Sequence, residues 1–111
     1  MSRLLRDNSA FLHLLMSSDT PKSQIKAILQ TVSKVQLNCL TEIAYNLLKG
    51  NISISPSHKK VLKRHAKHLR ALGKPKGTLK SKKAALIPSL ITALLRIVAP
   101  VLKSTNSNGT V

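Results

Sequence analysis

The residues with the clearest chemistry lie in the segment 55–83, which reads SPSHKKVLKRHAKHLRALGKPKGTLKSKK. This segment holds eleven of the nineteen Lys and Arg residues, three of the four His residues and no acidic residue. A merely solvated face normally mixes Glu and Asp with its cations, so an unmixed cationic run favours phosphate binding. The predicted nucleic-acid-binding residues are Lys59, Lys60, Lys63, Arg64, Lys67, Arg70, Lys74, Lys76, Lys80, Lys82 and Lys83.

The charge of the whole chain points to a polyanionic partner. The formal net charge is +16, and the three acidic residues Asp7, Asp19 and Glu42 all lie in the first 50 residues. A half-chain with thirteen cations and no acid is expected to bind nucleic acid, with DNA preferred to RNA, or an anionic membrane surface. Phe11 and Tyr45 are the only aromatic residues, so base stacking can contribute little and electrostatics should dominate the affinity.

Catalytic and metal-binding patterns are not found in the sequence. Three scattered acids do not make a carboxylate pair, and there is no Gly-rich phosphate loop or metalloprotease motif. A single cysteine, Cys39, excludes an internal disulfide and a Cys-based zinc site, and it is expected to pack as a small apolar side chain. We therefore expect a protein that is not an enzyme and has no cofactor.

The histidines of the basic segment are better explained as packed or interfacial side chains. His58, His65 and His68 are spaced by seven and three residues, whereas a metal pair on a helix prefers a spacing of four. Acid-triggered loosening is an open alternative, because protonation would charge a packed face.

Hydrophobic periodicity predicts an all-α fold, either a small helical hairpin or an arrangement of three to four helices. We expect helices at residues 2–16 and 21–49, the second either continuous or broken near Ser33, and a basic helix at 56–72 that begins after Ser55 and ends at Gly73. The short linker 51–54 should fold the basic helix back on its predecessor, completing a helical domain at residues 1–73. A flexible basic linker is expected at 74–83, because the run Gly73-Lys74-Pro75-Lys76-Gly77 at its start has two glycines and a proline that prevent the helix from continuing.

The segment 84–103 predicts an amphipathic apolar helix, followed by a disordered polar tail at 104–111. Its aliphatic residues occupy about half of the helical wheel. They contribute about −4 to −5 kcal/mol to bilayer insertion, and Arg96 alone opposes this by up to about 3.5 kcal/mol, so stable spanning is marginal. Packing on the domain, self-association and contact with a membrane interface all remain open for this helix. The predicted membrane or partner contacts are Leu86, Ile87, Leu90, Ile91, Leu94, Leu95, Ile97, Val98, Val101 and Leu102.

Two runs carry a resemblance to a known class of viral proteins. The run CLTEIAYNLLKGNISISPSHKKVLKRHAKHLRALGKPKG, followed by KSKKAALI, resembles a short basic protein of adintovirus-like or Polinton-like DNA virus elements over roughly residues 20–90. In those relatives a Gly-Gly-Phe step precedes the apolar tail, whereas this chain has Ile87-Pro88-Ser89 at that place. The resemblance implies a virion or core component and carries over no active site.

Together these features predict a non-catalytic basic protein that binds or condenses nucleic acid without strong sequence specificity. The alternative is a membrane-active protein that uses the C-terminal helix on anionic membranes. A nuclear or virion-associated location is expected, because residues 59–64 and 80–83 resemble a split nuclear-import signal and the viral resemblance implies a virion component. A secretory signal is not expected, since residues 11–16 form too short an apolar run.

Overall fold

The computed structural model describes the backbone of residues 2–109 and the side chains of residues 2–101. The described chain is all-helical, as predicted, but it divides into eight helices where three or four were expected. They are α1 (Arg3–Asp7), α2 (Ser9–Met16), α3 (Lys22–Gln30), α4 (Lys34–Leu48), α5 (Pro56–Lys63), α6 (Ala66–Leu72), α7 (Leu79–Ala84) and α8 (Pro88–Gly109).

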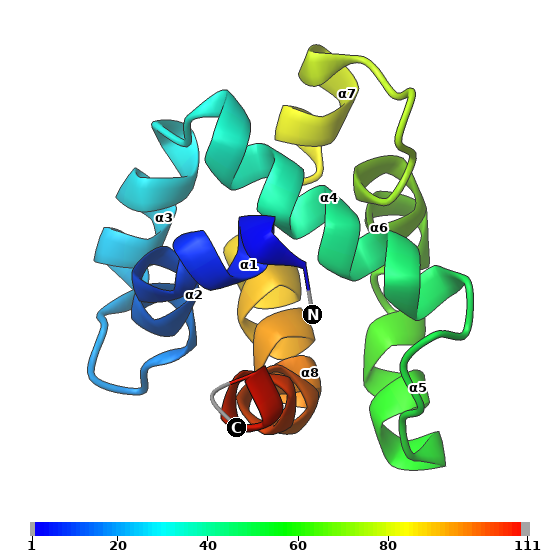
Figure 1. Ribbon diagram of the computed structural model, residues 1–111. Coiled ribbons are helices and arrows are strands. Elements are labelled where there is room, and N and C mark those ends of the chain that lie inside the picture. The colour runs from blue at the N-terminus through cyan, green and yellow to red at the C-terminus, as the bar shows by residue number, and fades with distance from the viewer. Residues whose placement is uncertain (1, 110–111) are drawn as a thin grey trace.

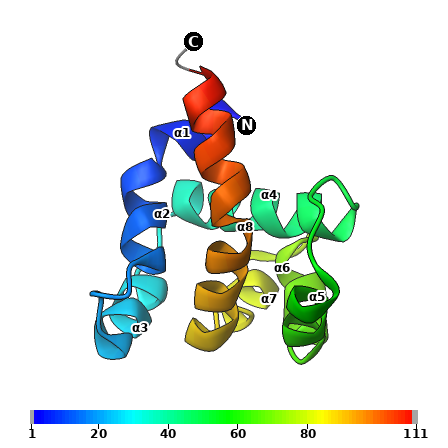
Figure 2. The same cartoon turned by 90° about the horizontal axis from the view of Figure 1, so that it is seen from below.

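Helix α8 is the centre of the fold (Figures 1 and 2). It packs against α2 and α3 on one side and against α5 on the other. Leu90, Ile91, Leu94, Leu95 and Val98 are all 0% exposed. The aliphatic face that the sequence left open is therefore the face around which the other helices pack.

Pro88, and not residue 84, begins α8, whereas Pro100 stands inside the helix and does not end it. The backbone of α8 continues to Gly109, past the predicted end at residue 103. The expectation of a disordered tail concerns residues 104–111, whose side chains lie outside the described residues.

The predicted helix 21–49 is broken at residues 31–33, which was one of the two alternatives. The Ser33 side chain accepts a hydrogen bond from the Gln36 backbone N–H at 3.1 Å, and the Gln36 side chain accepts one from the Ser33 backbone N–H at 2.9 Å. This reciprocal capping box starts a new helix. It also gives the polar side chain of Gln36, which lies among the apolar residues of α4, a hydrogen-bond partner.

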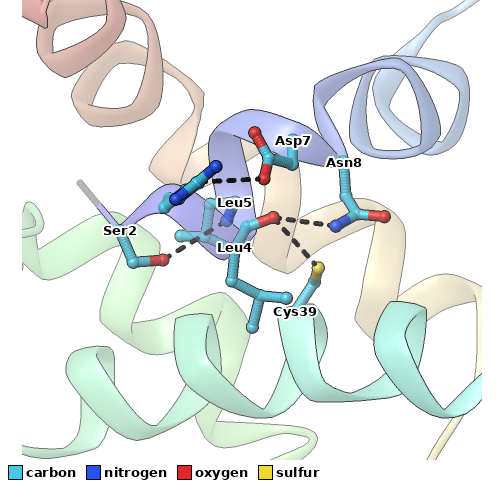
Figure 3. Close-up of polar contacts among 7 residues, drawn as sticks. Ser2, Leu4, Leu5, Asp7, Asn8 and Cys39 are labelled. Atoms are coloured by element: carbon cyan, nitrogen blue, oxygen red, sulfur yellow. Dashed lines mark hydrogen bonds and ion pairs between the residues drawn. The ribbon is translucent and has the colours of Figure 1, made fainter.

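The predicted helix 2–16 is likewise broken, at Asn8. The Asn8 side chain donates to the Leu4 carbonyl oxygen at 2.8 Å, so a local side-chain hydrogen bond replaces a helical one (Figure 3). The Ser2 hydroxyl donates to the Glu42 carboxylate at 2.6 Å, which ties α1 to α4. The break lets α1 and α2 follow the core in different directions.

Cys39 packs beneath α1, as a small apolar residue should. It is 0% exposed, and its thiol lies 3.8 Å from the carbonyl oxygen of Leu4 (Figure 3). Burial, helped by the nearby Glu42 carboxylate, raises the pKa of the Cys39 thiol to about 11. The thiol is therefore protonated and protected at neutral pH.

The raised pKa of Cys39 predicts a loss of stability in alkali. In the unfolded chain the thiol has a pKa near 8.5. The stability that comes from keeping the buried thiol protonated is therefore fully present below that pH and is lost as the pH rises toward about 11. The free energy of unfolding of the wild type should therefore fall, relative to that of Cys39→Ala, by about 2 kcal/mol between pH 7.5 and 10.5. Urea unfolding of both proteins at each pH measures this difference. Parallel pH dependences would contradict a buried thiol.

The predicted basic helix 56–72 is two helices, because the backbone turns at Arg64 and His65. Ser55 caps α5 and Pro56 occupies its first turn, as expected. Helix α6 packs on α4, as the hairpin prediction required, whereas α5 packs on α8. Helix α5 is anchored by the buried Leu62, and α6 by the buried Leu69 and Leu72.

Two glycines shape the approach of α6 to α4. Gly50, with φ of 77°, lets the chain turn after α4. Gly73 ends α6 at a normal φ, but a Cβ there would lie 3.2 Å from backbone atoms of Ala44 and Tyr45 and 2.7 Å from the Leu48 Cδ1 atom. Gly73 is therefore required for the close helix contact and not for its conformation.

Gly73→Ala should lower the free energy of unfolding by about 1 to 3 kcal/mol, because the α4 backbone cannot yield as a side chain can. Thermal and urea unfolding measure the loss. Gly77→Ala is the matched control on the same loop, where a Cβ would meet chiefly Lys74, a local neighbour, and the Lys82 side chain. Equal effects of the two substitutions would contradict the role of the α4–α6 contact.

Candidate nucleic-acid interface

We call residues 56–83, which comprise α5, α6, the following loop and α7, the basic arm. Ten of its eleven predicted phosphate-binding side chains are exposed. They are Lys59, Lys60, Lys63, Arg64, Lys67, Arg70, Lys74, Lys76, Lys80 and Lys83. Within residues 2–101 none of these cations pairs with a carboxylate, since the ion pair found there joins Arg3 to Asp7 on α1. The arm therefore presents an uncompensated positive surface.

Lys82 is the exception. It is 6% exposed, and its ammonium group lies 3.4 Å from the carbonyl oxygen of Pro75. The side chain thus fastens α7 to the preceding loop and does not lie on the outer surface.

The segment 74–83 is only partly the flexible linker that was expected. The Thr78 hydroxyl accepts a hydrogen bond from the Ser81 backbone N–H at 3.1 Å and caps α7. Helix α7 packs against α6 and α4, so Lys80 and Lys83 are carried on an ordered turn of helix. Lys74 and Lys76 remain on the loop.

The break at His65 divides the cations that a continuous helix would have placed in one arc. Lys59, Lys63 and Arg70 line a groove of about 490 Å³ between the arm, the end of α4 and the loop 51–54. Its floor is aliphatic, with Leu62 and Leu69 among the lining residues. The other cations of residues 56–72, namely Lys60, Arg64 and Lys67, are exposed outside this groove.

The histidines occupy three different environments. His58 is exposed in α5, His65 occupies the N-cap position of α6, and His68 is half-buried. Among the described side chains, no three His, Cys, Asp or Glu residues gather as metal ligands.

The predicted membrane or partner contacts on α8 and the residues before it are mostly interior. Beyond the five fully buried residues, Leu86, Ile87 and Ile97 are half-buried and pack against the core. Val101 is 36% exposed, and the side chain of Leu102 lies outside the described residues. Across the described helices, none combines the length and the hydropathy needed to cross a bilayer.

A second group of cations was missed at the sequence level. Lys22 and Lys26 of α3 and Arg96 of α8 line one cavity of about 710 Å³. These residues are isolated among neutral neighbours in the sequence, and only the packing of α3 against α8 brings them together. The spacing of four places Lys22 and Lys26 on one helical face, but no local sequence signal could have joined Arg96 to them.

Comparison with known proteins gives no further assignment. No protein-family model, no curated protein and no solved structure matches this chain.

Proposed function

We propose that this chain is a non-catalytic nucleic-acid-binding protein that holds DNA phosphates with its basic arm and condenses the polymer. The observation that carries the proposal is the exposure of ten arm cations on a chain with no acidic residue after Glu42. Like charges on neighbouring helical turns repel one another, and phosphates that displace bound counterions relieve this repulsion. RNA is a weaker candidate for the same surface.

The composition of the arm favours binding without strong sequence preference. Lysine, which acts as a point charge, supplies eight of the ten exposed cations, whereas base-edge reading is mainly the work of Arg, Asn and Gln. The two aromatic residues, Phe11 and Tyr45, are half-buried outside the arm, and the Tyr45 ring already has the Lys49 ammonium 5.6 Å from its centre. Stacking on bases is therefore not part of the proposal.

The membrane alternative is weakened by the place of α8. The aliphatic residues that would enter a lipid interface form the core, so insertion would require the fold to open. In this fold an anionic membrane would contact the same arm cations as DNA. A nuclear or virion location, with a role in packaging, accords with the sequence resemblance and the proposed DNA binding.

A salt titration on duplex DNA, RNA and anionic vesicles tests the proposal. If six to ten arm cations contact phosphates, the logarithm of the binding constant should fall against the logarithm of salt with a slope of about −5 to −9 on duplex DNA. Native and scrambled duplexes should bind alike. A slope near −1, or tight binding to vesicles alone, would contradict the proposal.

A further inference from the structure

The cavity between α3 and α8 has the chemistry of a phosphate site. Its residues that can donate hydrogen bonds to an anion include Lys22, Lys26, Arg96, Ser23, Ser89 and Thr92. Lysine, arginine and hydroxyl side chains are the usual contacts to nucleic-acid phosphates. No carboxylate lines the cavity among the described side chains, although Asp19 lies in the adjoining turn and is exposed.

This second face, defined as Lys22, Lys26 and Arg96, lies on the side of α8 away from α5 and its cations. Both views place α3 and α5 on opposite sides of the molecule with α8 between them (Figures 1 and 2). Arg96 belongs to the part of α8 that packs against α2 and α3, since its guanidinium Nε lies 3.4 Å from the carbonyl oxygen of Met16. Helix α8 therefore separates the second face from the α5 cations of the arm, whereas the α7 end of the arm leads into residues 87–89, which line the cavity.

We propose that the second face binds phosphates of a second duplex, so that one copy of the chain bridges two DNA segments. This inference rests on the proposed function of the arm. It supplies the step that condensation needs, because a protein with a single binding face coats DNA without joining segments.

The dimensions of the molecule make the bridge electrostatically feasible. The smallest extent of the fold is 28 Å, and the Debye length at physiological salt is about 8 Å. Two duplexes on opposite sides are thus separated by several Debye lengths, and their mutual repulsion is screened. Because the second face has three cations and the arm has ten exposed ones, the second face binds DNA more weakly than the arm does. It therefore takes up its duplex after the arm has bound the first one.

A capture assay tests the bridge. A biotinylated duplex is held on beads, and protein is added with a fluorescent duplex that lacks biotin, at 0.15 M salt. Wild-type protein should retain the fluorescent duplex. Lys22→Gln/Lys26→Gln should bind the second duplex about 30-fold more weakly, and Arg96→Gln about fivefold more weakly. Binding of a single duplex, followed by fluorescence anisotropy, should change little.

Arg3→Gln/Arg6→Gln is the matched control, since it removes two exposed charges from α1. It should capture like wild type, and circular dichroism checks that every variant is folded. Undiminished capture by Lys22→Gln/Lys26→Gln, or an equal loss in the control, would overturn the second face. So would a wild type that binds one duplex but captures no second one. Failure of the wild type to bind any duplex would instead overturn the proposed function of the arm.

Discussion

Replacing Leu94 with alanine should lower the free energy of unfolding by about 2 to 5 kcal/mol, and replacing it with glutamate should unfold the protein. Leu94 is 0% exposed on the buried face of α8, the central helix. A chain of this length is stable by only about 5 to 15 kcal/mol, so an unpaired buried carboxylate consumes most of that margin. Urea unfolding measures the alanine variant, and circular dichroism the glutamate variant.

Leu94→Met and Ser89→Glu are controls that separate the effect of lost side-chain volume from the effect of an added charge. The first keeps the side-chain volume and should cost less than about 1.5 kcal/mol. The second places the same charge on the same helix at an exposed position and should leave the protein folded. If Leu94→Glu were folded and lost only vesicle binding, α8 would be a membrane element and its central place in the core would be wrong.

The position of α8 also changes how the two functional hypotheses can be compared. If residues 84–111 were a tail separable from the domain, they could be deleted and the protein would still bind DNA. In the structure the deletion removes the helix against which α2, α3 and α5 pack, so the truncated chain should not fold. Substitution of exposed cations is the informative experiment, because it leaves the core intact.

The aliphatic spacing of residues 86–98 was enough to predict an amphipathic helix, but not its partner. Periodicity shows which side of a helix is apolar, and that side can face lipid, another copy or the rest of the chain. The choice depends on whether neighbouring helices can cover it. Leu12, Leu15 and Leu62, which are far away in the sequence, belong to the same buried cluster.

The three helix breaks differ in how clearly the sequence signals them. Ser33 and Gln36 fit a capping-box pattern that is visible in the sequence, and a break near Ser33 was one of the alternatives. Asn8 and His65 have no comparable pattern. Asn8 uses its side chain locally, and the turn at His65 lets Leu62 and Leu69 be buried although α5 packs on α8 and α6 on α4.

The candidate site was predicted where it depends on composition and missed where it depends on folding. Ten arm cations are exposed because each lies away from the buried leucines of its short helix or on a loop. Lys82 is covered because the loop with Pro75 closes over it, and the second face exists only because α3 meets α8. The pattern of charges along the sequence does not show which cations the fold covers or which it brings together.

Changing all six cations of residues 56–72 to glutamine should weaken duplex DNA binding about 10⁴-fold at 0.15 M salt and make the salt slope shallower by about 5. The residues are Lys59, Lys60, Lys63, Arg64, Lys67 and Arg70. Glutamine is a good helix former, and the substitutions remove repulsion between charges one turn apart. The melting midpoint should therefore stay constant or rise while the affinity collapses. Fluorescence anisotropy across a salt series and thermal unfolding measure the two quantities.

A charge-matched variant decides whether the arm or merely the net charge binds DNA. Residues 1–50 also contain six cations, namely Arg3, Arg6, Lys22, Lys26, Lys34 and Lys49. Changing those six to glutamine lowers the net charge from +16 to the same +10 but leaves the arm intact. This variant should lose the bridging activity of the second face and keep most of its affinity for a single duplex. Equal losses of single-duplex affinity in the two variants would show that the overall charge attracts DNA and that the arm has no privileged role.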